Sequence, residues 1–168
     1  MKGTKKLVRE FCSIAEVLEE QMGCFLFQFP PSYKYSPSRL KSIVAQAGVN
    51  ENLGRGGTRP YHNAVEFRHK SWWRKSVYNA FTKAGLIFCT TSGPRLPDEL
   101  VKTSDAIYVR FHGTKRWYRH DYSREELREW AEKIKASGAK EAWIYFNNDR
   151  DGFAIKNAKT IRRLLRGA

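Results

Sequence analysis

The chain has 168 residues, which is enough for one domain with a hydrophobic core. Its hydrophobic content of 41% excludes a disordered chain, and no apolar run reaches the ~20 residues that a membrane helix needs. Lys and Arg number 31 against 17 Asp and Glu, and the formal charge of +14 favours an anionic partner such as nucleic acid, a phosphorylated metabolite or a lipid headgroup.

The N-terminal residues predict a cytoplasmic protein that begins with an amphipathic helix. No apolar segment or small-residue cleavage site follows the basic start of the chain, so we expect no signal peptide. Residues 4–22 place apolar side chains at helical spacing, and Gly23 follows as a stop signal. The three cysteines have no C-x-x-C spacing, which argues against a disulfide framework and a zinc knuckle.

Strand and helix signals alternate along the rest of the chain. Five segments with apolar alternation or short apolar runs are predicted strands: 24–29, 64–69, 86–92, 106–113 and 141–149. The first is apolar enough to be buried on both faces, as parallel strands are. Helices are expected after Ser36, at Ser71 and at Ser123, where Glu126 completes a capping box. This alternation predicts parallel βαβ units in one α/β domain.

Two connecting segments and the last helix carry further signals. Residues 49–63, with glycines and a proline but no apolar period, predict a loop. Residues 114–122, TKRWYRHDY, interleave cations with aromatic rings, a composition that can stack on bases or sugars and neutralise phosphate; packing of the loop is the alternative. The last helix is expected to turn five apolar residues inward: Ala154, Ala158, Ile161, Leu164 and Leu165.

Charged and polar side chains lie near the ends of three predicted strands. The loops after the carboxyl ends of parallel strands form the ligand crevice of such folds. Arg110 and His112 share one strand face, and Glu66 and Arg68 share another. A buried arginine or glutamate is costly unless it is paired, so Glu66, Arg68 and Arg110 are expected to form one network. An ion-pair layer without function is the alternative.

The histidines are candidates for acid–base chemistry, because imidazole titrates nearest to neutral pH. His112 is the stronger candidate and His69 the weaker, and a structural role is open for both. A metal site could draw on six residues, but none of their spacings is diagnostic, so no metal ligand is predicted: Glu66, His69, His112, His120, Asp121 and Asp149. No phosphate-binding P-loop, dinucleotide fingerprint or nucleophile elbow is present, and the cofactor stays open.

Four motifs in chain order resemble the YecE-like family, also called DUF72: FLFQFPPSYKYSP, AVEFRHKSWW, SDAIYVRFHG and YFNNDRDGFAIKNA. The resemblance runs from about Cys24 to Leu165. It implies a partial TIM-type (β/α) barrel of uncharacterised biochemical function, as a single domain over residues 1–168. It also implies that nine matching positions line the barrel mouth: Gln28, Glu66, Arg68, Trp72, Arg110, His112, Asn147, Asn148 and Asp149.

The chain departs from the family's pattern in two respects. Family members usually begin with further strands, and five strands are expected here where a barrel has eight. Thr91 and Ser92 stand where many members carry an acidic residue. Because an open five-stranded remainder would expose strand edges, we expect a homo-oligomer, pairing with a separate N-terminal fragment, or a truncated gene product. A clean, stable monomer in size-exclusion chromatography would contradict this expectation.

The leading hypothesis is an enzyme that acts on a phosphate-containing anionic ligand such as nucleic acid. The expected catalytic residues are Glu66, His112 and Asp149. Seven residues are expected to bind the ligand, the arginines by holding phosphate: Gln28, Arg68, Trp72, Arg110, Tyr118, Asn147 and Asn148. The alternatives are a nucleic-acid or anion-binding module without turnover, a phosphosugar enzyme, and a basic surface with no dedicated partner.

Overall fold

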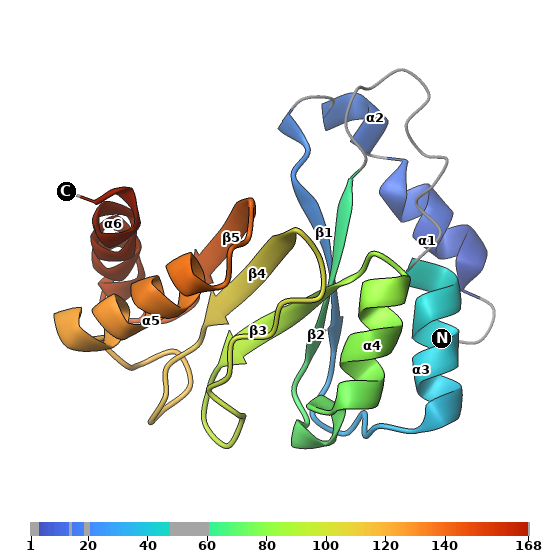
Figure 1. Cartoon of the computed structure of the whole chain (residues 1–168), viewed down its shortest axis with the longest axis horizontal. Coiled ribbons are helices and arrows are strands. Elements are labelled where there is room, and N and C mark those ends of the chain that lie inside the picture. Colours follow the sequence, from blue (N-terminus) through green and yellow to red (C-terminus); the bar gives the residue numbers. More distant parts are fainter. Residues whose placement is uncertain (1–3, 14, 19–20, 48–60, 168) are drawn as a thin grey trace. The chain divides into compact units, whose positions relative to one another are not determined.

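The computed structural model describes residues 4–13, 15–18, 21–47 and 61–167, in which strands and helices alternate largely as predicted (Figure 1). Five parallel strands follow one another in the sheet in chain order: β1 Cys24–Phe29, β2 His62–Phe67, β3 Ile87–Ser92, β4 Ala106–Phe111 and β5 Glu141–Phe146. The helices are α1 Lys5–Cys12, α2 Ala15–Leu18, α3 Pro37–Ala47, the 3-10 helix η3 Lys70–Trp72, α4 Lys75–Lys83, α5 Arg124–Ala136 and α6 Phe153–Arg166. This order is the topology of part of a (β/α) barrel, so the predicted fold class is confirmed.

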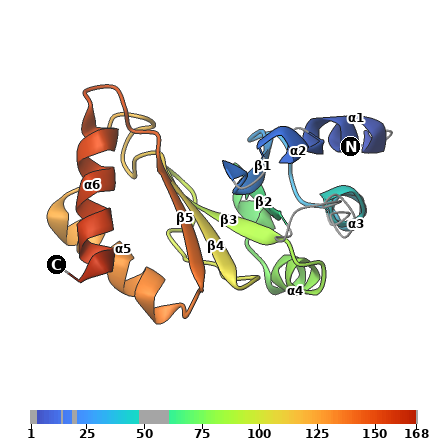
Figure 2. The ribbon, with the colours of Figure 1, turned by 90° about the horizontal axis from the view of Figure 1, so that it is seen from above.

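The chain divides into two compact units, of which the first is Met1–Phe88. Here β1 and β2 pair in register from Cys24↔His62 to Phe29↔Phe67. Figure 2 shows α3 and α4 on one side of these two strands. The core of this unit is aromatic. Phe67, Phe81 and Phe88 are fully buried and contact one another, with ring centroids 5.7 to 6.1 Å apart.

The second unit, Cys89–Ala168, contains the end of β3 with β4, β5, α5 and α6. Figure 2 shows α5 and α6 together on one side of β4 and β5. Phe111 stacks on Phe146 at 4.5 Å and meets Trp130 edge-on at 5.1 Å, which joins the strands to α5. The predicted capping box is confirmed, and so are the four predicted core residues of α5: Leu127, Trp130, Ala131 and Ile134.

The predicted boundaries around β2 are wrong. The strand starts two residues earlier than expected, at His62, and ends at Phe67, so Arg68 and His69 lie beyond it. Ser71 does not cap α4, which begins at Lys75 without a side-chain cap. The Ser71 hydroxyl instead accepts the N–H of Tyr35 at 2.8 Å, and this contact holds the segment in a 3-10 turn.

Burial also differs from prediction in two places. β1 was expected to be buried on both faces, but Leu26 and Phe27 are half-buried and Gln28 is exposed, because β1 is the first strand in the sheet order. In α6 Ala158 is exposed while Asn157 is buried. The predicted N-terminal helix is described as the two short helices α1 and α2, and most of the predicted loop at 49–63 lies outside the described residues.

In the described part of the chain, no helix combines the length and the apolarity needed to cross a membrane.

Candidate functional site

Three of the predicted site residues meet in the first unit. Glu66 is fully buried, and its carboxylate pairs with Nε of Arg68, whose side chain is 8% exposed. The Arg68 Nη2 group also donates to Gln28 Oε1 at 3.4 Å. The strand register explains this contact, because Gln28 of β1 lies opposite Glu66 of β2. The Glu66 to Arg68 part of the predicted network is therefore present.

Trp72 lies in the core of the first unit. Its side chain is fully buried, stacks on Phe67 at 4.0 Å and donates its indole N–H to Tyr33 O at 2.7 Å. These contacts give Trp72 a packing role. Nearby, His69 Nδ1 accepts the N–H of Ser71 at 3.2 Å. This histidine acts as a cap for η3.

The second unit brings Arg110 and Asn147 together at the carboxyl ends of β4 and β5. Arg110 Nη2 donates to Asn147 Oδ1 at 3.1 Å. Two residues earlier on each strand, Tyr108 stacks on Tyr145 at 5.0 Å. Side chains two residues apart point to the same side of a strand, so both pairs lie on one face of β4 and β5. The face therefore carries a half-buried guanidinium beside a strand-end amide. Participation of Arg110 in the network of Glu66 and Arg68 stays a prediction.

His112 directly follows β4 and is fully buried. The backbone N–H of His112 donates to the backbone carbonyl of Ser92 at 2.9 Å, and this bond extends the pairing of β3 and β4 by one residue. The imidazole centroid lies 5.6 Å from the Trp117 ring and 5.8 Å from the Tyr118 ring. The Tyr118 N–H donates to His112 O at 2.6 Å, and 45% of the Tyr118 side chain is exposed. The loop at 114–122 therefore folds back over the histidine.

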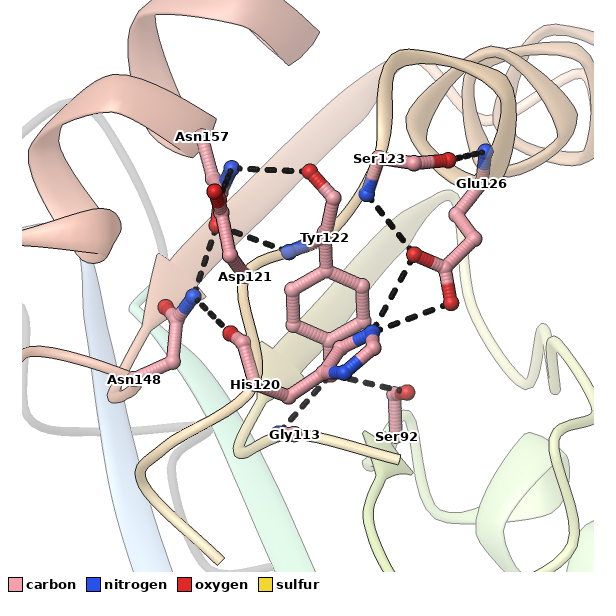
Figure 3. Close-up of polar contacts among 9 residues, drawn as sticks. All are labelled: Ser92, Gly113, His120, Asp121, Tyr122, Ser123, Glu126, Asn148 and Asn157. Atoms are coloured by element: carbon pink, nitrogen blue, oxygen red, sulfur yellow. Dashed lines mark hydrogen bonds and ion pairs between the residues drawn. The ribbon is translucent and has the colours of Figure 1, made fainter. Parts of the chain in front are cut away.

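Tyr122 fixes this loop to the strand ends (Figure 3). Its hydroxyl donates to Ser92 Oγ at 3.1 Å and accepts the N–H of Gly113 at 2.9 Å. Burial raises the pKa of Tyr122 to about 12, against the smaller opposing effect of its two hydrogen bonds. Ser92 is thus a buried partner of a tyrosine hydroxyl.

Asn157 holds the other end of the loop (Figure 3). Its Oδ1 accepts from Asn148 Nδ2 at 2.6 Å and from the Tyr122 N–H at 3.3 Å, while its Nδ2 donates to Asp121 Oδ1 and Tyr122 O, each at 3.1 Å. Asn148 also donates to His120 O at 2.7 Å. Both asparagines are buried, so Asn148 positions the loop rather than facing solvent.

Two further contacts of the loop involve charge. Lys156 Nζ donates to Asp121 Oδ2 at 2.6 Å, and this bond holds the pKa of Asp121 below its ordinary value. His120 Nε2 lies 3.0 Å from a carboxylate oxygen of Glu126, the residue that completes the capping box of α5. Asp149, expected to be catalytic, is exposed after β5. Among the described residues, no three His, Cys, Asp or Glu side chains are grouped so that they could hold a metal ion.

Sequence reasoning missed Tyr122 and Asn157 as organisers of the site. Asn157 lies four residues before the buried Ile161 on α6, so helical spacing placed it on the inward face. An asparagine on the inward face of a helix indicates a hydrogen-bonded network, because a buried amide requires hydrogen-bond partners. Tyr122 carried no comparable signal, since its partner Ser92 lies 30 residues away in the chain.

Replacing Tyr122 with phenylalanine is expected to lower stability at neutral pH by about 1–2 kcal/mol, because the buried Gly113 N–H and Ser92 hydroxyl lose their partner. The folded-state pKa of Tyr122 is raised, so the unfolded chain loses this proton first and stability falls between about pH 10 and pH 12. The Tyr122→Phe variant should show a smaller fall in urea midpoint over that range. Tyr145→Phe, whose ring is 43% exposed, is the control and should follow the wild type; an equal fall in all three proteins would contradict the prediction.

Comparison with known proteins places the chain in a family. The model described as "Protein of unknown function DUF72" matches residues 1–168. The UPF0759 protein YunF of Bacillus subtilis (strain 168) is 26% identical over 172 residues, which cover 86% of this chain and 58% of YunF.

Solved structures agree with this result. A DUF72 family protein from Thermotoga maritima MSB8 superposes with a TM-score of 0.82 and 29% identity, over 98% of this chain and 66% of that protein. A DUF72 family protein from Enterococcus faecalis V583 shows the same fold at 18% identity and a TM-score of 0.81, over 98% of this chain and 67% of that protein. This chain thus spans about three fifths to two thirds of these relatives. Since the family model covers all of its residues and the resemblance to YecE-like proteins is confirmed, the chain belongs to the DUF72 family.

Proposed function

We propose that the protein binds a phosphate-containing anionic ligand, with nucleic acid as the favoured class, at the carboxyl ends of β4 and β5 and the loop at 114–122. The observation that carries the proposal is the pairing of Arg110 with Asn147 at this end of the strands. A guanidinium has five N–H donors in a planar fork that matches phosphate geometry, more than the bond to the Asn147 amide oxygen uses.

The loop beside this pair adds positive charge and an aromatic ring. Lys115, Arg116 and Arg119 are exposed, and so is Tyr118. Asp121, the acid of the loop, is neutralised by Lys156. Cations beside an exposed ring can neutralise phosphate and stack on a base, which is the combination that single-stranded nucleic acid requires. The net charge of +14 acts in the same direction at longer range.

Binding rather than turnover is the function that this geometry supports. His112, the expected acid or base, is fully buried beneath Trp117 and Tyr118. A general base must come within hydrogen-bond reach of the proton it abstracts. Catalysis by His112 would therefore require the loop to move away from the imidazole, whereas binding by Arg110 and the exposed loop cations requires no such movement.

The Arg116→Ala/Arg119→Ala variant is expected to bind a fluorescein-labelled oligouridylate about tenfold more weakly than the wild type, because two phosphate contacts are removed. The slope of log affinity against log salt should flatten by about 1.4, since each contact to a single strand contributes about 0.7. Fluorescence anisotropy at several salt concentrations measures both quantities.

The matched control is Arg162→Ala/Arg163→Ala on α6, where both residues are exposed and the charge removed is the same. It should retain most of the wild-type affinity. Equal losses in the two variants would mean that only the overall charge attracts the ligand. No binding by the wild type at low salt would contradict the choice of nucleic acid.

A further inference from the structure

A second group of cations lies in the first unit, on the segments that follow β1 and β2. Within residues 21–47 and 61–88 the only acidic residue is Glu66, which is buried against Arg68. The cations after the two strands are exposed: Lys34, Arg39, Lys70 and Arg74. No carboxylate in these ranges is available to neutralise them at the surface, so this part of the first unit is electropositive.

Two of these cations are held in place by tyrosines. Arg39 Cζ lies 4.5 Å from the ring centroid of Tyr33, and Arg74 Cζ lies 4.0 Å from that of Tyr35. Arg39 Nη1 donates to Lys34 O at 2.7 Å, and Arg74 Nε donates to Ser71 O at 3.0 Å. Each guanidinium therefore retains N–H donors that no described residue engages.

The tyrosines themselves rest on a rigid base. The Tyr33 ring stacks with Phe29 at 4.6 Å and with Trp72 at 5.8 Å, and Tyr35 meets Trp72 edge-on at 5.3 Å. The two segments are also joined through backbone groups, because Trp72 donates to Tyr33 O and Tyr35 donates to Ser71 Oγ. Ordering the arginines in the free protein lowers the entropy lost when they bind a ligand.

We propose that Lys34, Arg39, Lys70 and Arg74 form a binding surface for single-stranded nucleic acid, separate from the strand-end site of the second unit. The lysines and the free guanidinium donors contact phosphates. The guanidinium planes of Arg39 and Arg74 stack on unpaired bases, as arginine planes do in RNA recognition. A duplex offers phosphates but no unpaired bases, so a single strand is the better match to this chemistry.

The charge reversal Lys34→Glu/Lys70→Glu tests the phosphate contacts. Lys34 and Lys70 are exposed, and within the described residues their ammonium groups take part in no hydrogen bond or ion pair, so we expect the fold to tolerate the change. We expect this variant to bind a fluorescein-labelled 20-residue oligouridylate at least ~10-fold more weakly than the wild type. Lys41→Glu/Lys83→Glu, an equal charge change on exposed positions of α3 and α4, should weaken binding by less than ~3-fold. Equal weakening in the two variants would overturn the proposal.

The variant Arg39→Lys/Arg74→Lys tests stacking, because it keeps the charge and removes the planes. The wild type should prefer the oligouridylate to an abasic strand of the same length, and this variant should lose most of that preference. Equal binding of both strands by the wild type, or tighter binding to phosphatidylserine vesicles than to the oligouridylate, would overturn the proposal.

A measurement on the unaltered protein guards against variants that fail to fold. Photocrosslinking to a 4-thiouridine strand should label peptides that contain Tyr33, Tyr35 or the two arginines, and labelling confined to other peptides would overturn the proposal. Because these residues all lie in the first unit, failure here is distinguishable from failure of the loop variants in the second unit.

Discussion

Replacing Gly113 with alanine is expected to lower the free energy of unfolding by about 3 kcal/mol or more. Gly113 has φ +98°, a conformation that L side chains rarely adopt. A Cβ at this position would lie 2.5 Å from Arg116 O and 2.8 Å from His120 Cβ. The first contact is with backbone, so relief requires the loop at 114–122 to shift. Urea unfolding followed by tryptophan fluorescence measures the loss.

Gly138→Ala is the matched control for Gly113→Ala. Gly138 also has a positive φ, +61°, but a Cβ there would meet nothing within 4 Å. Only the conformational penalty remains, and it amounts to about 1–2 kcal/mol. Similar losses at the two positions would show that backbone conformation, and not the close approach of the loop, requires glycine at 113. If the loop shifts in Gly113→Ala, oligouridylate binding through Arg116 and Arg119 should weaken as well.

Signals carried by neighbouring residues predicted most of the fold. The capping box of Ser123 and Glu126 spans three residues, and the inward face of α5 repeats within one or two turns, so both were readable from the sequence. The same holds for parallel strands, because short apolar runs that alternate with helices leave few other arrangements. At β2 a contact distant in sequence prevailed, since the Ser71 hydroxyl is engaged by Tyr35 and does not cap α4.

The candidate site was predictable where one strand determines the geometry. Alternation predicted that Arg110 and His112 share one strand face, but not that Arg110 is hydrogen-bonded to Asn147, because that contact depends on the register of β4 with β5. The arrangement of the loop at 114–122 was not predictable, because it depends on pairs such as Tyr122 with Asn157, 35 residues apart. The same loop buries His112, and a strand pattern contains no information about a loop that covers its end.

Replacing Glu66 with leucine is expected to destabilise the protein by about 3–5 kcal/mol, which is the usual effect of removing one partner from a buried ion pair. The side chain of Arg68 is only 8% exposed, so its charge would lose its carboxylate partner without gaining full hydration. Chemical unfolding of the wild type and Glu66→Leu measures this loss. Lys135→Leu, which removes an exposed ion pair with Glu132, is the control and should change stability by less than about 1 kcal/mol.

The double variant Glu66→Leu/Arg68→Met tests how much the ion pair itself contributes to stability. Removing both charges leaves no buried guanidinium without a partner, so the double variant should regain most of the stability that Glu66→Leu loses. This recovery would show that Glu66 is required for stability because Arg68 is present. If the loss of stability in the double variant equalled the sum of the losses in Glu66→Leu and Arg68→Met, direct coupling between the two residues would be contradicted. In that case groups other than Arg68 would stabilise the buried carboxylate of Glu66.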